Sequence, residues 1–324
     1  MLQINIFGFT KKRFPFTQFA MNEICNISPE NKEKIMLHLY CHKDDKDMWY
    51  KEATQEKYQD LDVAIHLMDN ADYVHKVPIA HQTTAEFSCK LDEDCFMSRY
   101  LWDYAIENLG LLNADPRVSV IVPLLSNGIP SVDLFLLDFL LLEEREPAYE
   151  MWHRDGLKST LDVWGCNYRK LQAFIESMPK WDAEAYWKFM DAYNPIEGRP
   201  WLPSNLQWAK GLHPCRFSDP YHYFILEKTM KYKDKILQKQ NYYLEARDTA
   251  YLCNSIFFAK TSFWKESFAL LYDGYDEGQM TILAKMKGMR PVYIRNGFGI
   301  HMAYGGVPHQ QEIEDLYIKQ LCST

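Results

Sequence analysis

The chain of 324 residues lacks three features that would place it in common protein classes. None of its eight cysteines forms a CxxC pair, so neither a zinc cage nor a disulfide framework is indicated, and we expect reduced, buried thiols. Its longest apolar stretch, 134–142, is interrupted by Asp138 and is far short of the roughly 20 residues that cross a bilayer. Residues 2–7 show neither the basic segment nor the cleavage site of a signal peptide, so we expect a cytoplasmic protein without a transmembrane segment.

An excess of positive charge is also missing. The formal net charge is −8 and the isoelectric point is about 5.7, which argues against a protein that holds nucleic acid through bulk positive charge. A local basic patch remains open, and one lysine run, typical of a solvated helix face, is a candidate: Lys228, Lys231, Lys233, Lys235 and Lys239. Hydrophobic residues make up 47% of the chain, which suffices for a sizeable core.

Strand-like and helix-like segments alternate over the first part of the chain. The patterns predict strands and helices in this order: strand Ile4–Phe9, helix Phe16–Ile27, strand Lys34–His42, helix Asp45–Gln59, strands Val74–Val77 and Phe87–Leu91, helix Ser98–Asn108 and strand Val118–Pro123. This order is typical of an α/β fold with a Rossmann-like, mostly parallel sheet and helices on both faces. In such folds ligands bind beyond the carboxyl ends of the strands.

The pattern changes after residue 142. The next stretch is rich in Trp and Tyr, carries prolines at 195, 200, 203, 214 and 220, and lacks the pattern of regular strands, so it predicts a long helical or irregular insertion. The α/β pattern then returns with Ser255–Ala259, Gln279–Lys287 and Val292–Asn296. We therefore divide the chain into residues 1–142, an insertion at 143–250, and a C-terminal part at 251–324.

Three acidic residues follow the expected strand Phe87–Leu91. They stand in the run Lys90-Leu91-Asp92-Glu93-Asp94-Cys95-Phe96, at the carboxyl end of that strand. Only one residue separates Asp92 from Asp94, so both can turn toward one hard cation whose other positions take phosphate oxygens and water. Such an ion neutralises charge on a leaving nucleoside diphosphate. The alternative is a solvated acidic turn, because this spacing is common.

This run, after a βαβαβ start, resembles the DxD signature of the GT-A nucleotide-diphospho-sugar transferases, particularly the large inverting family two. The resemblance covers residues 1–125 and 250–304 and leaves out the insertion. It implies a GT-A fold, a Mn²⁺ or Mg²⁺ ion held by Asp94 and Asp92, and a nucleoside-diphosphate sugar, first of all a UDP-sugar, as donor. It also implies nucleotide-sugar contacts from the first strand ends and the DxD strand: Phe7, Thr10, Arg13, Asp44 or its neighbour Asp45, Lys90 and Asp92.

A second acidic pair, Asp276 and Glu277, precedes the expected helix Gln279–Lys287. Helix capping explains carboxylates at this place, because they satisfy unpaired N–H groups and oppose the helix dipole. The resemblance implies a further role, since inverting GT-A enzymes carry an acidic pair at the start of a late helix with a glycine at the spacing of Gly288 from Glu277. It implies that Glu277 is the base that deprotonates the acceptor hydroxyl. Asp276 is the alternative, because the pair is reversed relative to the common Glu-Asp order.

Three further residues complete the expected site. His301 stands in the glycine-rich run 297–306. A lone histidine is more often packed or exposed than a ligand, but the resemblance implies that His301 completes the metal site and that the glycines let a loop close over the diphosphate. Asn127 and Asp133 lie in a stretch with the composition of a tight turn, and the resemblance places them on the sugar and acceptor side.

These features predict a metal-dependent, inverting glycosyltransferase. On this interpretation residues 1–142 bind the donor, 143–250 lie on the acceptor side, and 251–324 carry the base and the metal-binding histidine. The acceptor stays open. A glycan or polysaccharide precursor in a bacterial cytoplasm is favoured by the acidic isoelectric point, whereas the lysine run and the aromatic insertion keep open hydroxymethylated bases of phage DNA in an infected host.

Two rival functions belong to other classes. A nucleotidyltransferase shares the sheet and the metal but normally has a basic, glycine-rich loop after the first strand. Lys11 to Arg13 supply the charge, but Gly8 is the only glycine there. A non-catalytic nucleotide-sugar-binding protein would leave the two acidic clusters and His301 without a shared purpose.

Overall fold

The structure is a computed structural model of the chain. It describes residues 1–8, 11–69, 73–125, 139–145, 147, 224, 227–238, 241–246, 255–270, 276–301, 312, 315–316 and 318–319. No helix within these ranges is long and apolar enough to cross a membrane.

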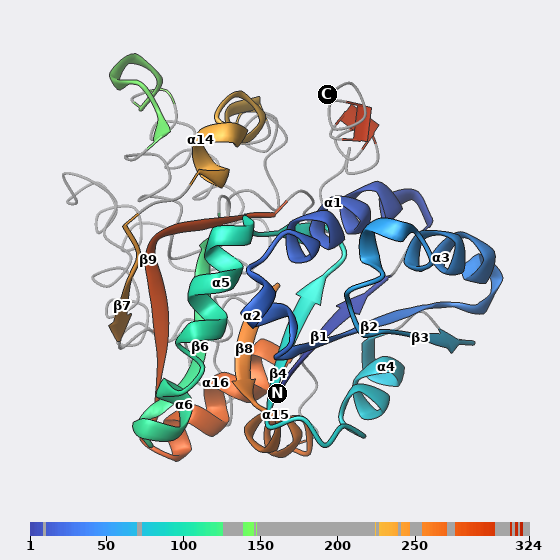
Figure 1. The fold of residues 1–324 in the computed structure, drawn as a ribbon. Helices are drawn as coiled ribbons and strands as arrows, with labels where there is room; N and C mark the ends of the chain where they lie inside the picture. The colour runs from blue at the N-terminus through green and yellow to red at the C-terminus, as the bar shows by residue number, and fades with distance from the viewer. Residues whose placement is uncertain are drawn as a thin grey trace, which may run out of the picture.

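The described residues include a sheet of nine strands (Figure 1). The strands are β1 Leu2–Phe7, β2 Ile35–His42, β3 Val63–Met68, β4 Phe87–Asp92, β5 Cys95–Phe96, β6 Val118–Leu125, β7 Tyr243–Ala246, β8 Ile256–Lys260 and β9 Arg290–His301. Their order is β3-β2-β1-β4-β8-β6-β9-β5, and β7 also pairs with β9. Strands β1 to β4, β6 and β9 share one direction, whereas β8 lies antiparallel between β4 and β6. The expected α/β class with a largely parallel sheet is therefore confirmed.

The order of the strands reverses between β1 and β4. From β1 the chain adds β2 and then β3 on one side, and it then returns to place β4 on the other side of β1. In open α/β sheets, ligands bind outside the carboxyl ends of the strands at such a switch point. The two strands end at Phe7 and Asp92, which are register partners. The topology therefore predicts a ligand site at the carboxyl ends of β1 and β4, where these two residues lie.

Helices connect the strands and cover both faces of the sheet (Figure 1). They are η1 Lys11–Arg13, α1 Phe14–Cys25, α2 Pro29–Lys32, η2 Lys43–Asp45, α3 Lys46–Ala53, η3 Glu56–Tyr58, α4 Tyr73–Ala80, α5 Arg99–Glu107, α6 Leu111–Ala114, α14 Lys233–Leu237, α15 Thr261–Phe268 and α16 Asp276–Met286, where η marks a 3₁₀ helix. On one face Trp102 of α5 packs against Phe258 of β8, with ring centroids 5.5 Å apart. On the other face Trp264 of α15 packs against Phe257, whose side chain points the opposite way along the same strand.

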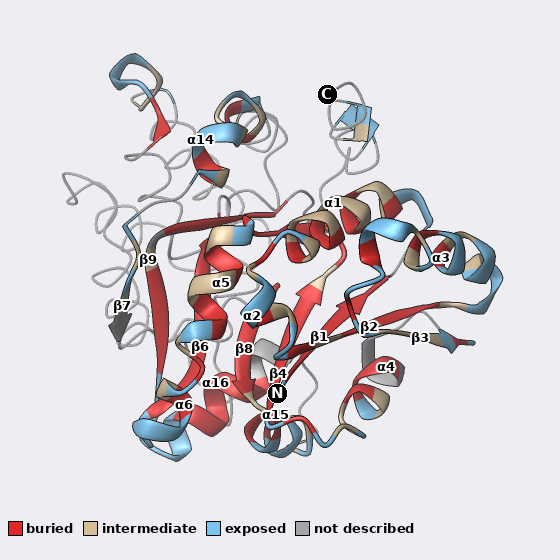
Figure 2. Ribbon diagram, viewed as in Figure 1, coloured by how far each residue is buried: buried red, intermediate tan, exposed pale blue. Residues whose placement is uncertain are grey.

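Burial on both faces explains the sequence pattern of the central strands. Every residue of β1 and of β6 is buried (Figure 2). A strand covered on two sides has no solvent-facing positions, and β6 accordingly reads as a nearly continuous apolar run. Strand β1 instead includes Gln3 and Asn5, which are buried and hydrogen-bond to each other. The sequence therefore marked β6 clearly.

The third strand was placed wrongly by the sequence pattern. We expected it at Val74–Val77, but these residues lie inside α4, and β3 is formed by Val63–Met68. A stretch of four residues, Val-His-Lys-Val, is too short to distinguish a strand from a helical turn. Strand β3 lies at the edge of the sheet with only Met68 buried, so it lacks the apolar signature of its neighbours.

The stretch 143–250 contains a strand that we did not expect. Strand β7 pairs antiparallel with β9 and so extends the central sheet. Its four residues, Tyr-Leu-Glu-Ala, are too few to show a strand period. Most of the remaining insertion lies outside the described residues.

An ion-pair cluster, which we call the Glu144 cluster, joins the two sides of this stretch. A carboxylate oxygen of Glu144 accepts from Lys231 at 2.6 Å and lies 3.0 Å from the ammonium of Lys228, and its other oxygen accepts from the hydroxyl of Tyr232 at 2.6 Å. Burial alone would raise the pKa of Glu144, but the hydrogen bonds from Lys231, Tyr232, the Leu141 N–H and Lys228 lower it well below its ordinary value. The chain before residue 145 is therefore fixed to the chain at 228–232.

We expect acid sensitivity from a histidine pair on β2 and β3. The Nε2 of His66 lies 3.0 Å from Nδ1 of His38. Burial, and then the neighbouring His66, lower the pKa of His38 to about 4 from its ordinary 6.5. Between these two values the unfolded chain binds a proton that the folded chain does not, so the free energy of unfolding should fall as the pH falls from about 6.5 to about 4, by at most about 1.4 kcal/mol per pH unit. His38→Gln should reduce this slope in chemical denaturation measured across that range. An unchanged slope would show that other groups cause it.

Candidate metal centre

The acidic run lies in a tight turn at the switch point. Strand β4 ends at Asp92, Glu93 and Asp94 form the turn, and β5 begins at Cys95. The Glu93 side chain is fully buried and that of Asp94 is only 6% exposed, whereas that of Asp92 is 20% exposed. The alternative of a solvated acidic turn is therefore wrong. Carboxylates taken out of water require compensating positive charge or hydrogen-bond donors.

Strand β9 brings His301 to this turn. Its first part pairs with β6, and it then bends sharply (Figure 1) and pairs with β5, where Cys95 lies directly opposite His301. A β-carbon at Gly299 would lie 2.9 Å from Cδ2 of Leu125, so a larger residue here would require the Leu125 side chain to move.

The glycines of this run have a different role from the one we expected. Gly297 and Gly299 lie inside β9. A β-carbon at Gly297 would lie 2.6 Å from Cδ1 of Leu101 in α5. Both glycines are therefore packing positions of a strand, and the expectation that they belong to a loop closing over a diphosphate is wrong for these two. Gly305 and Gly306 lie outside the described residues.

Three donor atoms of different chemistry meet in the turn. The Nε2 atom of His301 lies 3.7 Å from Oδ1 of Asp94, and the Sγ atom of Cys95 lies 3.7 Å from the same oxygen. The three donor atoms all lie within 4.8 Å of one another, and all three residues are buried. An imidazole nitrogen, a carboxylate oxygen and a sulfur at this spacing form a donor set that fits a divalent metal ion.

Two cations accompany the carboxylates. The guanidinium of Arg13, from η1, lies 3.2 Å from Oδ2 of Asp94 and 3.6 Å from Oε1 of Glu93, and the ammonium of Lys90 lies 2.8 Å from Oδ1 of Asp92. Three carboxylates and two cations therefore meet at this turn.

The residues that we expected to contact the nucleotide sugar do not all lie at the candidate site. Phe7 is fully buried and stacks on Tyr40 with ring centroids 5.0 Å apart, so its side chain belongs to the core. Asp44 lies in η2 after β2 with its side chain 76% exposed. Arg13 and Lys90 lie beside the DxD carboxylates. Three other expected residues lie outside the described residues: Thr10, Asn127 and Asp133.

The expected base residues begin α16. This helix starts at Asp276, so Asp276 and Glu277 lie in its first turn, as the sequence predicts. The structure describes only the backbone of these two residues. Gly288 has φ 66°, its N–H bonds to Lys285, and the N–H of Met289 bonds to Ala284, which is the Schellman arrangement that ends a helix. The spacing from Glu277 to Gly288 therefore equals the span of one capped helix.

One residue of the donor set was not expected from the sequence. Cys95 follows the DxD residues directly, and we assigned it to the scattered buried thiols. Its involvement depends on the pairing of β5 with β9, which local sequence does not reveal. The available signal was its position immediately after a DxD run at a strand end.

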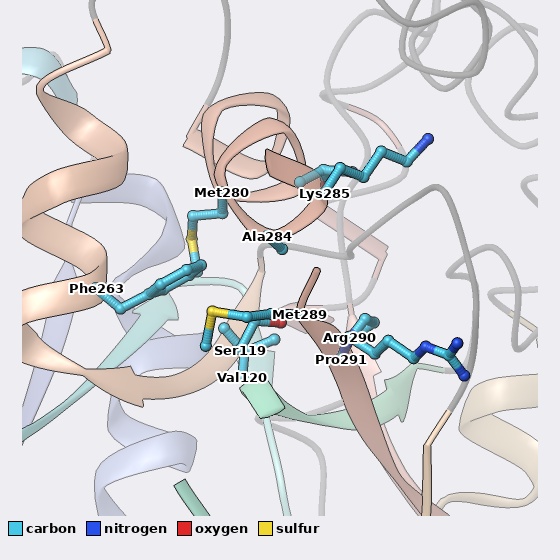
Figure 3. A pocket seen from close by; sticks show the side chains of 10 residues that line it. Ser119, Val120, Phe263, Met280, Ala284, Lys285, Met289, Arg290 and Pro291 are labelled. Atoms are coloured by element: carbon cyan, nitrogen blue, oxygen red, sulfur yellow. The ribbon is translucent and has the colours of Figure 1, made fainter. Parts of the chain in front are cut away.

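A separate hollow lies at the amino ends of the strands, away from the Asp94 cluster. It is lined by residues of α15, α16 and the beginnings of β6 and β9, including Phe263, Met280 and Met289, with Lys285 and Arg290 directed outward (Figure 3). Residues 118 and 290 begin parallel strands, so this hollow lies at their amino ends. Ligand sites of open α/β sheets lie at the carboxyl ends. We therefore assign the candidate site to the cluster around Asp94.

Comparison of the sequence with models of known protein families and with curated proteins finds no match. The function of this chain must therefore be inferred from the geometry and chemistry of the cluster itself.

Removal of Arg13 should test the charge arrangement. Arg13→Met leaves Asp94 and Glu93 without their shared cation and should lower the free energy of unfolding by about 3 kcal/mol. A divalent ion should then stabilise the variant more than it stabilises the parent chain, because it supplies the missing charge. The measurement is denaturant unfolding with and without the ion.

The matched control is Arg117→Met, because Arg117 pairs with Asp115 at 2.7 Å on the surface. This variant should change stability little and should respond to the ion like the parent. An equal response to the ion in Arg13→Met and in the parent would mean that the ion does not bind beside Arg13.

Proposed function

We propose that the chain is a metal-dependent glycosyltransferase of the GT-A type. It moves a sugar from a nucleoside-diphosphate sugar, first of all a UDP-sugar, to an acceptor hydroxyl with inversion. The observation that carries the proposal is the juxtaposition of Asp94, the second carboxylate of the DxD run, with His301 at the switch point of an α/β sheet. The family resemblance of the run 90–96 adds to it.

The position of the cluster supports a phosphate-bearing ligand. It lies at the carboxyl ends of β1 and β4, where helix starts and loops of this fold class receive nucleotides. Arg13 and Lys90 place a guanidinium and an ammonium beside these strand ends, and such groups bind phosphate oxygens well. Asp94 and His301 hold the divalent ion in this proposal. When bound, the ion stabilises the charge on the departing nucleoside diphosphate.

The base belongs to α16. Inverting transfer requires a group that removes the proton of the acceptor hydroxyl as its oxygen attacks the anomeric carbon. Glu277, with Asp276 as the alternative, takes this role by the resemblance. Eleven residues of helix span about 16 Å, so this pair lies at the opposite end of α16 from the turn at Gly288.

Ion pairs in the Glu144 cluster favour one of the two expected acceptors. Two of the lysines in the candidate DNA-binding run, Lys228 and Lys231, already pair with Glu144. Engaged lysines are less available to DNA phosphates, and the net charge of −8 adds to the electrostatic cost. These observations favour a glycan or polysaccharide precursor over modified DNA.

The nucleotidyltransferase alternative loses support from Gly8. Its N–H donates to the carbonyl of Tyr40 at 2.8 Å, and its carbonyl accepts from the buried Lys76. A β-carbon at this position would lie 2.6 Å from the Trp49 ring. Packing thus explains this glycine, and it does not require a phosphate-binding loop.

Metal and nucleotide should stabilise the protein together. A divalent ion plus UDP should raise the melting temperature by more than the sum of their separate effects, because an ion that bridges protein and diphosphate couples the two binding events. Asp94→Ala should abolish this synergy in a thermal-shift assay. Asp115→Ala, which removes a carboxylate at the amino end of β6, should retain it. Full synergy in Asp94→Ala would place the ion elsewhere.

Replacement of the acidic pair should separate catalysis from helix capping. Glu277→Gln keeps the shape of the side chain but does not accept a proton at neutral pH, so transfer should fall by a factor on the order of 10² to 10⁴. Folding and binding of ion and nucleotide should persist. A cap alone contributes only about 0.5 to 2 kcal/mol of stability.

Asp276→Asn is the companion variant, because either carboxylate can be the base, and Glu266→Gln in α15 is the control. The measurement is the rate of sugar transfer across a panel of donors and acceptors. Transfer within a few-fold of the parent in both variants of the pair would show that it serves only as a cap.

A further inference from the structure

We propose that Cys95 is a ligand of the metal ion and that its sulfur makes the site select zinc over magnesium. This inference rests on the proposed metal-binding role of Asp94 and His301. The family resemblance leads to an expectation of Mn²⁺ or Mg²⁺, held by the oxygen donors of the DxD run and the imidazole of His301. The structure adds a sulfur atom to that set.

The spacing of the donor atoms suits a four-coordinate ion. Bonds of about 2.0 to 2.3 Å at a tetrahedral centre place neighbouring donor atoms about 3.3 to 3.6 Å apart. The Asp94 oxygen lies 3.7 Å from the His301 nitrogen and 3.7 Å from the Cys95 sulfur. All three atoms lie within 4.8 Å of one another, so small rotations of the side chains would bring them to one ion.

Three protein donors leave one coordination position for another group. Catalytic zinc sites have this arrangement, whereas structural sites use four protein ligands. An oxygen of the donor diphosphate is the ligand that the proposed function places in the open position.

The surroundings of the sulfur hold the donors in place. Asp94 presents Oδ1 to Cys95 and His301, while its Oδ2 lies 3.2 Å from Arg13. A charged partner on the second oxygen fixes the orientation of the first, as outer contacts of metal ligands do.

The chemistry of sulfur decides which ion fits. Thiolate and imidazole favour zinc and similar borderline ions, whereas magnesium takes oxygen ligands and retains water. On binding, the Cys95 S–H bond breaks, the proton leaves to solvent, and the sulfur electron pair forms the bond to the ion. No change of oxidation state is involved.

Cobalt reports directly on a sulfur ligand. Apo protein titrated with Co²⁺ should develop a near-ultraviolet thiolate-to-cobalt charge-transfer band at one equivalent. Cys95→Ser replaces sulfur by a hard oxygen of similar size and should lose this band. Its affinity for Zn²⁺, measured by competition with a chromophoric chelator, should fall at least about 100-fold, because changes even to outer contacts of a metal ligand cost 10- to 100-fold. Its affinity for Mg²⁺ should change little.

The control is Cys25→Ser. Cys25 is a partly exposed cysteine whose thiol donates to the carbonyl of Lys57 at 2.6 Å. This variant should keep both the band and the zinc affinity. Absence of the band in the parent, or its persistence in Cys95→Ser, would overturn the proposal, and the first of these results needs no variant to fold.

Failure of the Cys95 proposal can be distinguished from failure of the proposed glycosyltransferase function. A sulfur-to-cobalt band without any binding of nucleotide sugars would retain the Cys95 ligand and remove the glycosyltransferase. Synergy between ion and UDP without the band would retain the glycosyltransferase and remove Cys95 from the metal site.

Discussion

The burial of acidic side chains at the end of β4 is the constraint on which the candidate site depends. Moving an ionised carboxylate out of water costs several kcal/mol unless an opposite charge accompanies it. Arg13 meets this requirement for Asp94 and Glu93, and Lys90 meets it for Asp92. The start of α1 must therefore lie over the turn after β4, and the tip of β9 closes the other side with His301. Charge compensation thus joins η1 to the turn after β4, and strand pairing adds β9.

The central sheet was predictable because its strands are covered on both faces. The expected bounds of β1, β2, β4 and β6 agree with the structure to within a few residues. The strand at Val63–Met68 escaped notice because it lies at the edge, where partly exposed positions dilute the apolar signal. Strand β7 is too short to show a period, and its existence depends on the partner that β9 offers. Local sequence carries burial patterns well and carries tertiary pairing poorly.

The same distinction between local sequence pattern and tertiary pairing applies to the candidate site. The DxD spacing is local, so the sequence alone marked Asp92 and Asp94 as a pair at a strand end. His301 was expected only through a family resemblance, because its neighbourhood with Asp94 requires the bend of β9 and its pairing with β5. Cys95 adjoins Asp94 in the chain, yet its orientation toward the same point depends on that pairing as well. The burial of Glu93, between two residues expected to bind an ion, was likewise a property of the folded turn.

The Glu144 cluster has a consequence for the engineering of this chain. It fixes the point where the chain leaves the α/β part close to the point where it returns, since Glu144 contacts Lys228 and Lys231. The entropy of closing a loop grows only with the logarithm of its length, by about 0.6 kcal/mol for each doubling. Once both ends are fastened, the intervening segment can lengthen, shorten or be exchanged with little effect on the sheet. The cluster thus marks a position at which a segment of different length or sequence can be joined to the α/β part.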